Sequence, residues 1–314
     1  MLYRRWRGDE PESQHRGSWV LVDAHGEVLA GKGVHEHPVF ARSSLKSIQA
    51  VPLVESGAAD RFGIDDVELT LAMSSHNGDP FQTDPIGRML RRLGLDVADL
   101  RCGAPPSAAT ALQNPCSGKH AAFLALALHL GDDPSAYLDP ESASQQRVRL
   151  AVAELCEVDA STLVGAVDGC GAPAYALPLE RLATGVARLT TPDGLAPARG
   201  AACRRLTAAA AAHPGLLSHG ETRMDARLLE LTAGRLFPKS GAEGVQIVGV
   251  VGGGQALAVK VDDGDPRAVP RITLALLVHL GLLTADDRSG LSPLGDTLIH
   301  NIAGRQVGRH EVLV

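Results

Sequence analysis

The sequence predicts a protein of the α/β (α+β) class, in which an antiparallel sheet flanked by helices joins a mostly helical lobe. Two hairpin patterns support the sheet. Residues 18–30 contain two apolar strands around an Ala-His-Gly turn, and residues 243–251 and 255–262 flank a Gly-Gly-Gly turn. The chain between these hairpins has mostly helical patterns. We therefore expect one sheet built from both ends of the chain, with the helical lobe inserted between them.

Length and composition narrow the class of protein. The chain has 314 residues, 45% of them hydrophobic, and can bury a large core. We expect a single catalytic unit over 1–314, with a sheet-containing lobe at about 1–62 and 160–314 and a helical lobe at about 63–159. A net charge of −6 without basic runs argues against nucleic acid and membrane partners and favours a small-molecule substrate. Five cysteines without a signal-peptide pattern, and no apolar run long enough to cross a bilayer, predict a cytoplasmic location.

The order of apolar, polar and turn-forming residues predicts further strands, helices and a loop along the chain. A strand at 162–167 is expected to be buried, and one at 305–314 to lie at a sheet edge after a polar tail. Small polar residues at 74–80 predict a loop. Helices are expected at 43–56, 65–73, 84–93, 121–130, 140–156, 178–189, 198–213, 221–236 and 271–283.

A serine and a lysine stand at the start of the first of these helices. Ser43 and Lys46 occupy positions i and i+3, which share a helix face, so the amine is predicted to reach the serine hydroxyl. The chain has 25 arginines but only five lysines, and a lysine, unlike an arginine, can act as a base once burial lowers its pKa. The pair is therefore a candidate nucleophile and base. The alternative is a serine at a helix start followed by a solvated lysine.

Two further motifs follow in a known order. Ser75-His76-Asn77 lies in the 74–80 loop, and Lys239-Ser240-Gly241 leads into the second hairpin. With Ser43-x-x-Lys46 they resemble the S-x-x-K, S-D-N and K-T-G motifs of serine penicillin-recognising enzymes. This order predicts a serine β-lactamase-like fold with a cleft beside the Ser43 helix, between the sheet and the helical lobe.

Cysteines stand beside other reactive residues at two places. Cys116 and Lys119 are three residues apart on the first turn of an apolar helix, where the helix dipole is expected to lower both pKa values. Asp168 and Cys170 lie among glycines after the 162–167 strand, a place where binding sites are common. A glycine turn with a packing thiol explains the second pair equally well.

The sequence resembles a known family over nearly its whole length. The matching segments are HRGSWVLVDAHGEVLAG, residues 40–57, the Ser-His loop, NPCSGKHAAFLALA, VDGCGAPAYALPLERLA and FPKSGAEGVQ. They resemble the Rhizobium etli-type (class 3, thermolabile) L-asparaginases, the asparaginase II family. This resemblance implies an amidohydrolase that releases ammonia from L-asparagine, on a fold similar to serine β-lactamases and glutaminases and usually as a homodimer.

The resemblance also implies roles for particular residues. Two serine–lysine pairs would meet in the cleft, Ser43 with Lys46 and Ser75 with Lys239. A Zn²⁺ ion would lie beside Asp168, and its ligands would be Cys116, Lys119 and Cys170. The ion would orient the substrate more than it would take part in the attack on the amide. Two thiolates and a nitrogen donor suit zinc.

The expected reaction begins with attack of Ser43 on the side-chain amide carbon while Lys46 takes its proton. Ser75 and Lys239 would then pass a proton to the leaving ammonia. Arg42 is expected to clamp the substrate carboxylate, and Asp168 to pair with the substrate amine or with a lysine. The candidates for substrate binding are Arg42, His76, Asn77, His120 and Asp168.

Two other functions fit the same motifs. One is a β-lactamase-like serine esterase or amidase that acts on another acyl group, and the other is a catalytically silent binding protein of the same fold. The choice between asparagine and glutamine stays open, because one methylene group in a pocket is worth only about 1–3 kcal/mol.

Overall fold

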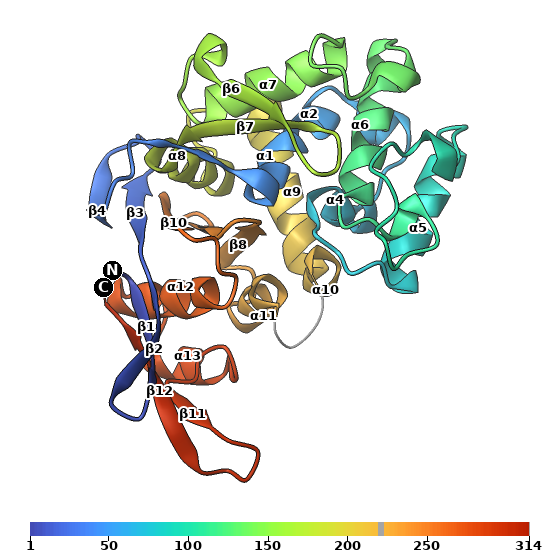
Figure 1. The fold of residues 1–314 in the computed structure, drawn as a ribbon. Helices are drawn as coiled ribbons and strands as arrows, with labels where there is room; N and C mark the ends of the chain where they lie inside the picture. The colour runs from blue at the N-terminus through green and yellow to red at the C-terminus, as the bar shows by residue number, and fades with distance from the viewer. Residues whose placement is uncertain (219–222, 314) are drawn as a thin grey trace.

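A computed structural model describes residues 1–218 and 223–313 of the chain (Figure 1). Both predicted hairpins are present, and strands from the two ends of the chain pair side by side. The main sheet is antiparallel throughout, with the order β4 (Val28–Lys32), β3 (Gly17–Asp23), β10 (Gln255–Val261), β9 (Val245–Val250) and β8 (Leu236–Gly241). The structure confirms the predicted fold class, an antiparallel sheet with flanking helices and a mostly helical lobe (Figure 1).

The main sheet is buried on both faces except at its edge strand β4, most of whose residues are exposed. In β3, Val20 and Val22 belong to a core shared with the helical lobe, whereas Trp19 and Leu21 belong to a second core with α12 (Ala268–His279). Successive strand residues face opposite sides, which explains why the GSWVLVD segment of β3 is apolar almost without interruption. Helix α8 (Leu179–Thr190) packs on the first face.

The helical lobe surrounds α6 (Ser117–Leu130), which is buried from its first residue to Ala127. A Cβ atom at Gly118 would lie 2.2 Å from the Leu71 backbone oxygen, so α6 crosses α4 (Asp66–Met73) in direct contact. Helices elsewhere in the chain, some of them outside this lobe, are α3 (Ala58–Arg61), α5 (Pro80–Arg92), α7 (Ala143–Leu155), α9 (Pro197–Ala212), α10 (Pro214–Leu217), α11 (Met224–Leu231) and α13 (Ala285–Ser289). Short 3₁₀ turns are η2 (Val97–Asp99), η3 (Ala111–Gln113), η4 (Pro134–Ala136) and η5 (Ala160–Thr162).

The predicted helix at 43–56 is broken into three short pieces. They are η1 (Arg42–Leu45), α1 (Lys46–Gln49) and α2 (Val51–Glu55). Pro52 lacks the N–H that a continuous helix would bond to the Ile48 carbonyl. The prediction of one continuous helix is therefore wrong.

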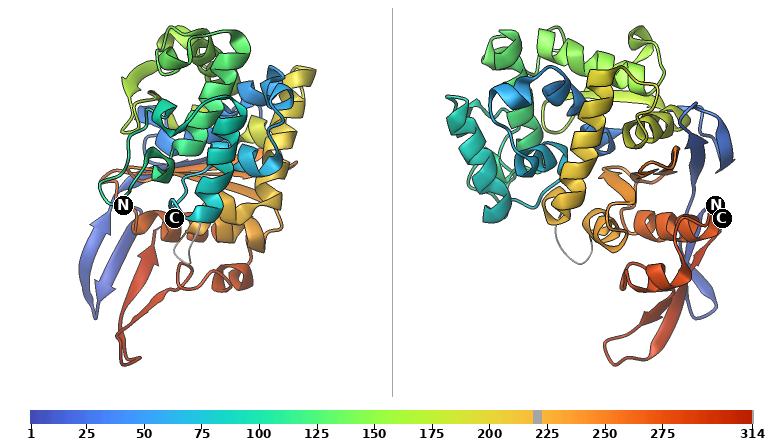
Figure 2. Two further views of the ribbon diagram at one scale, coloured as in Figure 1. Left: turned by 90° about the vertical axis from the view of Figure 1, so that its right-hand side faces the viewer. Right: turned by 180° about the vertical axis from the view of Figure 1, so that it is seen from behind.

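The two chain ends form a second antiparallel sheet, the terminal sheet, which projects from the body of the molecule (Figures 1 and 2). Its order is β11 (Leu298–His300), β12 (Gln306–Val312), β1 (Tyr3–Arg7) and β2 (Glu10–His15). The prediction of an edge strand at 305–314 is wrong, because β12 has a partner on each side. One of those partners, β11, comes from the stretch that the sequence suggested was a polar tail.

A third sheet has the order β5 (Pro38–Phe40), β7 (Pro173–Pro178) and β6 (Val164–Val167). Every residue of β6 is exposed, so the prediction of a buried strand at 162–167 is wrong. The physical reason is its place in the sheet, since β6 is an edge strand and β7 takes the buried position.

Several predicted helices differ at their ends. Helix α5 begins earlier than expected because Asp79 serves as its N-cap and Pro80 can occupy its first position. The helix predicted at 221–236 is represented by α11 and ends early, with Ala233 in the left-handed region (φ 48°) before β8. Residues 219–222 lie outside the described part of the chain. No helix among the described residues is long and apolar enough to span a membrane.

Candidate active site

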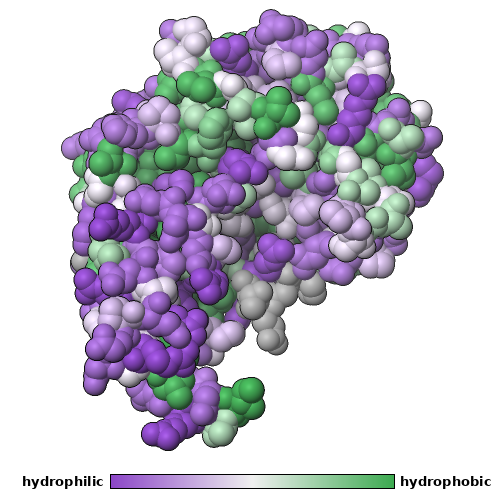
Figure 3. Space-filling model, viewed as in Figure 1, coloured by the Kyte–Doolittle hydropathy of each residue, from purple (hydrophilic) through white to green (hydrophobic). Residues whose placement is uncertain are grey.

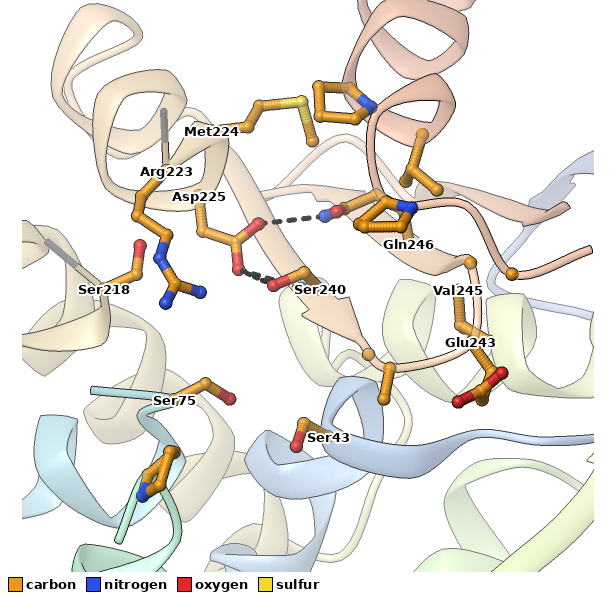
Figure 4. A pocket seen from close by; sticks show the side chains of 18 residues that line it. Ser43, Ser75, Ser218, Arg223, Met224, Asp225, Ser240, Glu243, Val245 and Gln246 are labelled. Carbon is orange, nitrogen blue, oxygen red and sulfur yellow. Dashed lines mark hydrogen bonds between the residues drawn. The ribbon is translucent and has the colours of Figure 1, made fainter. Parts of the chain in front are cut away.

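A cavity of about 500 Å³ opens where the end of β8, the start of α11 and the Ser43 segment meet (Figure 4). Ser43 and Ser75, from two of the predicted serine motifs, both line it. The rest of the wall is formed mainly by the turn between β8 and β9 and by residues just before and within the first turn of α12. Its volume is that of a pocket for a small molecule.

The Ser75 hydroxyl lies between two lysine amines. Lys46 Nζ is 3.2 Å and Lys239 Nζ is 3.0 Å from Ser75 Oγ. Lys46 also donates to the backbone oxygens of Ser74 and Pro115 at 2.5 and 3.1 Å. The i, i+3 spacing predicts a hydrogen bond between Lys46 and Ser43, but none joins them among the described residues, because the Lys46 side chain extends across to the loop after α4. The two predicted serine–lysine motifs therefore meet at Ser75.

Both lysines are almost completely withdrawn from solvent, with 1% of Lys46 and none of Lys239 exposed. Burial lowers the pKa of Lys46, and the charge of Lys119 adds to this effect while Cys116 opposes it. Burial also lowers the pKa of Lys239 to about 8, against the opposing charge of Asp225. Removal of a cation from water favours its neutral form. The amines are therefore able to exchange protons far more readily than a solvated lysine.

Asp225 binds the residue next to Lys239 in β8. The sequence motifs did not indicate Asp225. Its carboxylate is buried and accepts hydrogen bonds from the Ser240 N–H (2.8 Å), the Ser240 hydroxyl (2.7 Å) and Gln246 Nε2 (3.0 Å) (Figure 4). Lys239 Nζ lies 3.7 Å from Asp225 Oδ2. The available signal was an aspartate in the first turn of the largely apolar helix MDARLLEL.

Replacement of Asp225 by asparagine is expected to lower the free energy of unfolding by about 2–4 kcal/mol. An amide has one acceptor oxygen, so its NH₂ group would face a donor of Ser240 or Gln246, and Lys239 would lose its anionic neighbour. Urea unfolding measures the change. Asp60→Asn is the control, because the Asp60 side chain is 75% exposed where it pairs with Arg205. The control should change stability by at most about 0.5 kcal/mol, and equal losses in the two variants would contradict the role of Asp225.

Arg42 turns toward Asp168 at the edge of the Ser43 segment. Its Nε and Nη2 atoms donate to Asp168 Oδ1 at 3.2 and 3.0 Å. Burial opposes ionisation of Asp168, but the hydrogen bond and charge of Arg42, with help from Lys119, lower its pKa. Arg42 has a φ of 51°, in the left-handed region where non-glycine residues are uncommon and often functional. The ionic partner of Asp168 is therefore this arginine and not a lysine.

Cys116, Lys119 and Cys170 lie together beside this pair. Lys119 Nζ donates to Cys170 Sγ at 3.3 Å. A hydrogen bond from the Cys170 thiol lowers the pKa of Cys116 to about 4, with Lys46 and Lys119 contributing, and the same bond raises the pKa of Cys170. The hydrogen bond from Cys170 and the charges of the two lysines outweigh the effect of burial, which alone would raise the pKa of Cys116. Two sulfurs and an amine within hydrogen-bond reach form a donor set that suits zinc.

The two candidate histidines are buried behind the site. His76 Nδ1 accepts from the Gly78 N–H and its Nε2 lies 2.9 Å from Ser117 Oγ, while burial lowers its pKa to about 4. His120 Nδ1 lies 2.7 Å from the Tyr137 hydroxyl. Neither histidine lines the cavity. Asn77 is exposed, and its Oδ1 accepts from Arg223, which does line it.

A comparison with known protein families shows to which of them this chain belongs. The family L-asparaginase II matches residues 4–312. The chain belongs to the L-asparaginase II family. This confirms the family that the sequence motifs indicated, and it makes this L-asparaginase II family member an amidohydrolase of the asparaginase type.

Three solved structures resemble this L-asparaginase II family member distantly. A β-lactamase from Mycobacterium bovis is 15% identical over 84% of this chain and 94% of its own, with a TM-score of 0.44. Mglu in its native form in 4.3 M NaCl is 16% identical over 85% of this chain and 61% of its own, with a TM-score of 0.41. Mglu in its tris and glutamate form is 16% identical over 86% of this chain and 60% of its own, with a TM-score of 0.38. A comparison with curated proteins gave no match.

Proposed function

We propose that this protein hydrolyses L-asparagine to L-aspartate and ammonia through an acyl-enzyme on Ser43. The observation that carries the proposal is the contact of two buried lysine amines with Ser75, at the wall of a cavity that Ser43 also lines. Family membership supports an amide substrate. A serine hydroxyl is a weak nucleophile, and a desolvated lysine amine is a base that can activate it.

In the first half of the reaction, Ser43 Oγ attacks the side-chain amide carbon and its proton passes to neutral Lys46. Catalytic hydrogen bonds often tighten only in the substrate complex, and we expect the Lys46–Ser43 contact to form there. Protonated Lys239 gives a proton through Ser75 Oγ to the amide nitrogen, and the C–N bond breaks to release ammonia. An ester on Ser43 remains.

In the second half, water attacks the ester carbon. Its proton returns to Lys239 through Ser75, and Lys46 returns its proton to Ser43 Oγ as the C–O bond breaks. Both lysines then have their initial protonation states, so the cycle is balanced. This scheme needs one neutral and one protonated lysine at the start, and the pKa of about 8 for Lys239 suits the protonated role at neutral pH.

Arg42 and Asp168 suit the two charges at the α-carbon of the substrate. We propose that the Arg42 guanidinium binds the α-carboxylate and that Asp168 binds the α-ammonium group. The two side chains bind each other, so each charge has a partner that the substrate groups can replace. Asn77 would act at the rim through Arg223, and His76 and His120 would support the walls.

We also propose that Cys116, Lys119 and Cys170 bind Zn²⁺. The donor set fits, because Cys116 already favours the thiolate form and Cys170 lies within hydrogen-bond reach of both other donors. When bound, the ion would supply a positive charge that helps to orient the substrate. The homodimer and the cytoplasmic location remain predictions.

Ammonia release from L-asparagine by the purified protein tests the proposal, with L-glutamine in parallel and a chelator in a third arm. We expect release from L-asparagine, and kcat/KM should fall as pH rises above about 8, because protonated Lys239 is then lost. Substrate ammonium also titrates in alkaline solution, so the same profile is recorded for Asp225→Asn. Loss of the Asp225 charge should lower the pKa of Lys239 and move this alkaline limb to lower pH in the variant alone.

Other outcomes would favour the alternatives. No release from either amide, with zinc supplied, would contradict the asparaginase proposal and direct attention to esters and β-lactams. Covalent labelling by a penicillin would favour the β-lactamase-like enzyme. If the chelator removes bound zinc, measured by mass spectrometry, without any change in activity, the ion has no role in turnover.

A further inference from the structure

A second cavity, of about 550 Å³, lies between the terminal sheet and the start of α12. Its wall carries Arg5, Arg223, Arg267 and Arg271 together with His15 and His310, and the described residues that line it include no aspartate or glutamate. It shares Arg223, Pro266 and Pro270 with the candidate substrate cavity. Figure 3 shows hydrophilic residues gathered over the region of the terminal sheet.

Carboxylates near this cavity neutralise its arginines only in part. Arg271 donates to the backbone oxygens of Pro293, Leu294 and Asp296, and it forms no ion pair with a carboxylate of the described chain. Arg5 Nε lies 2.9 Å from Glu12, but Arg7 binds the same carboxylate at 2.8 Å. One negative charge therefore serves two arginines, and the wall retains positive charge.

Arg223 donates to Asn77 Oδ1 and forms no ion pair among the described residues, whereas the remaining charged groups at this wall are paired or neutral. Arg267 binds Asp265 at 2.5 Å, and His15 lies 2.8 Å from Asp263. Burial, together with the charges of Arg271 and Arg5, lowers the pKa of His310 to about 4, so its ring is neutral at pH 7. The first turn of α12 contains no acidic residue, and the positive end of its dipole lies at the same wall.

We propose that this second cavity binds a small oxyanion with two negative charges, a phosphate ester or a dicarboxylate, through Arg271 and Arg5. Guanidinium groups bind phosphate and carboxylate oxygens with paired, charge-assisted hydrogen bonds. The concave wall places both arginines around one space, which scattered surface arginines do not do. This inference does not depend on the proposed amidase reaction.

Titration calorimetry of the full chain with inorganic phosphate, and separately with malonate, tests the proposal at low ionic strength. Arg5→Gln should raise the Kd by about tenfold or more. Arg7→Gln is a matched control, because Arg7 lies on the same strand and binds the same Glu12 but does not line the cavity. The control should change the Kd by less than about twofold.

Arg271→Gln is a second test and should also raise the Kd by about tenfold or more. Arg271 donates to three backbone oxygens, so thermal unfolding of Arg271→Gln is measured in parallel. If Arg271→Gln does not fold, the Kd of Arg5→Gln tests the proposal. Binding of phosphate alone assigns the site to phosphate esters, malonate alone to dicarboxylates, and both to the wider class. No binding of either anion, or equal weakening in Arg5→Gln and Arg7→Gln, would overturn the proposal. Ammonia release is not part of this measurement, so a failure here leaves the proposed reaction untouched.

Discussion

Ser43→Ala is expected to lower kcat for ammonia release from L-asparagine by about 10⁴-fold or more. The variant has no hydroxyl to form the ester, so only weak catalysis by the surrounding polar groups remains. Ser43 lines the cavity, and loss of one hydroxyl there should leave the fold unchanged. Steady-state kinetics measure the effect, and mass spectrometry of the quenched wild-type reaction should find the acyl group on the peptide that contains Ser43.

Two serine variants make the comparison specific. Ser56→Ala, at the end of the same helical segment and away from the cavity, should retain wild-type activity. Ser75→Ala should lose about 10²–10³-fold, since it removes a proton relay and not the nucleophile. If Ser43→Ala remained active while Ser75→Ala lost all activity, the nucleophile would be Ser75, which both lysines contact.

Lys46→Met is expected to lower kcat by about 10³-fold or more. Methionine has a similar length but no amine, so Ser43 would lose its base. The variant should still fold, because methionine fills the buried space with an apolar side chain of similar length, although the backbone oxygens of Ser74 and Pro115 lose their donor. Ammonia release and circular dichroism measure the two properties.

An arginine at the same position tests whether Lys46 acts as a base or only through a positive charge. Lys46→Arg carries a permanent positive charge and cannot accept the Ser43 proton, so it should be as inactive as Lys46→Met. Lys32→Met, which removes an exposed lysine that binds the Leu313 backbone oxygen, is the control and should keep full activity. Substantial activity in Lys46→Arg would show that Lys46 is not the base.

Local patterns were enough to find most of the candidate site. Ser43, Lys46, Ser75 and Lys239 stand in short motifs, and the structure brings their side chains to one place. The spacing of Ser43 and Lys46 nevertheless suggested the wrong hydrogen bond. A helical face specifies which residues are near each other in one segment, but the nearest acceptors of Lys46 come from the loop after α4 and from Pro115.

The residues that escaped prediction depend on contacts between distant segments. Asp225 has no motif of its own, and it matters because β8 and β9 bring Ser240 and Gln246 to it. The second cavity has the same origin, since its arginines come from β1, the start of α11 and α12.

The family, the antiparallel hairpins and the reactive serines, lysines and cysteines can be recognised without the structure, because each is encoded in short runs of residues. The fold was needed to show which serine the lysines contact, which carboxylate Arg42 binds and where β6 and β12 lie in their sheets. Those outcomes depend on the packing of segments far apart in the chain and on the burial that shifts the pKa values of Lys46 and Lys239. Neither quantity is contained in the spacing of residues along one segment.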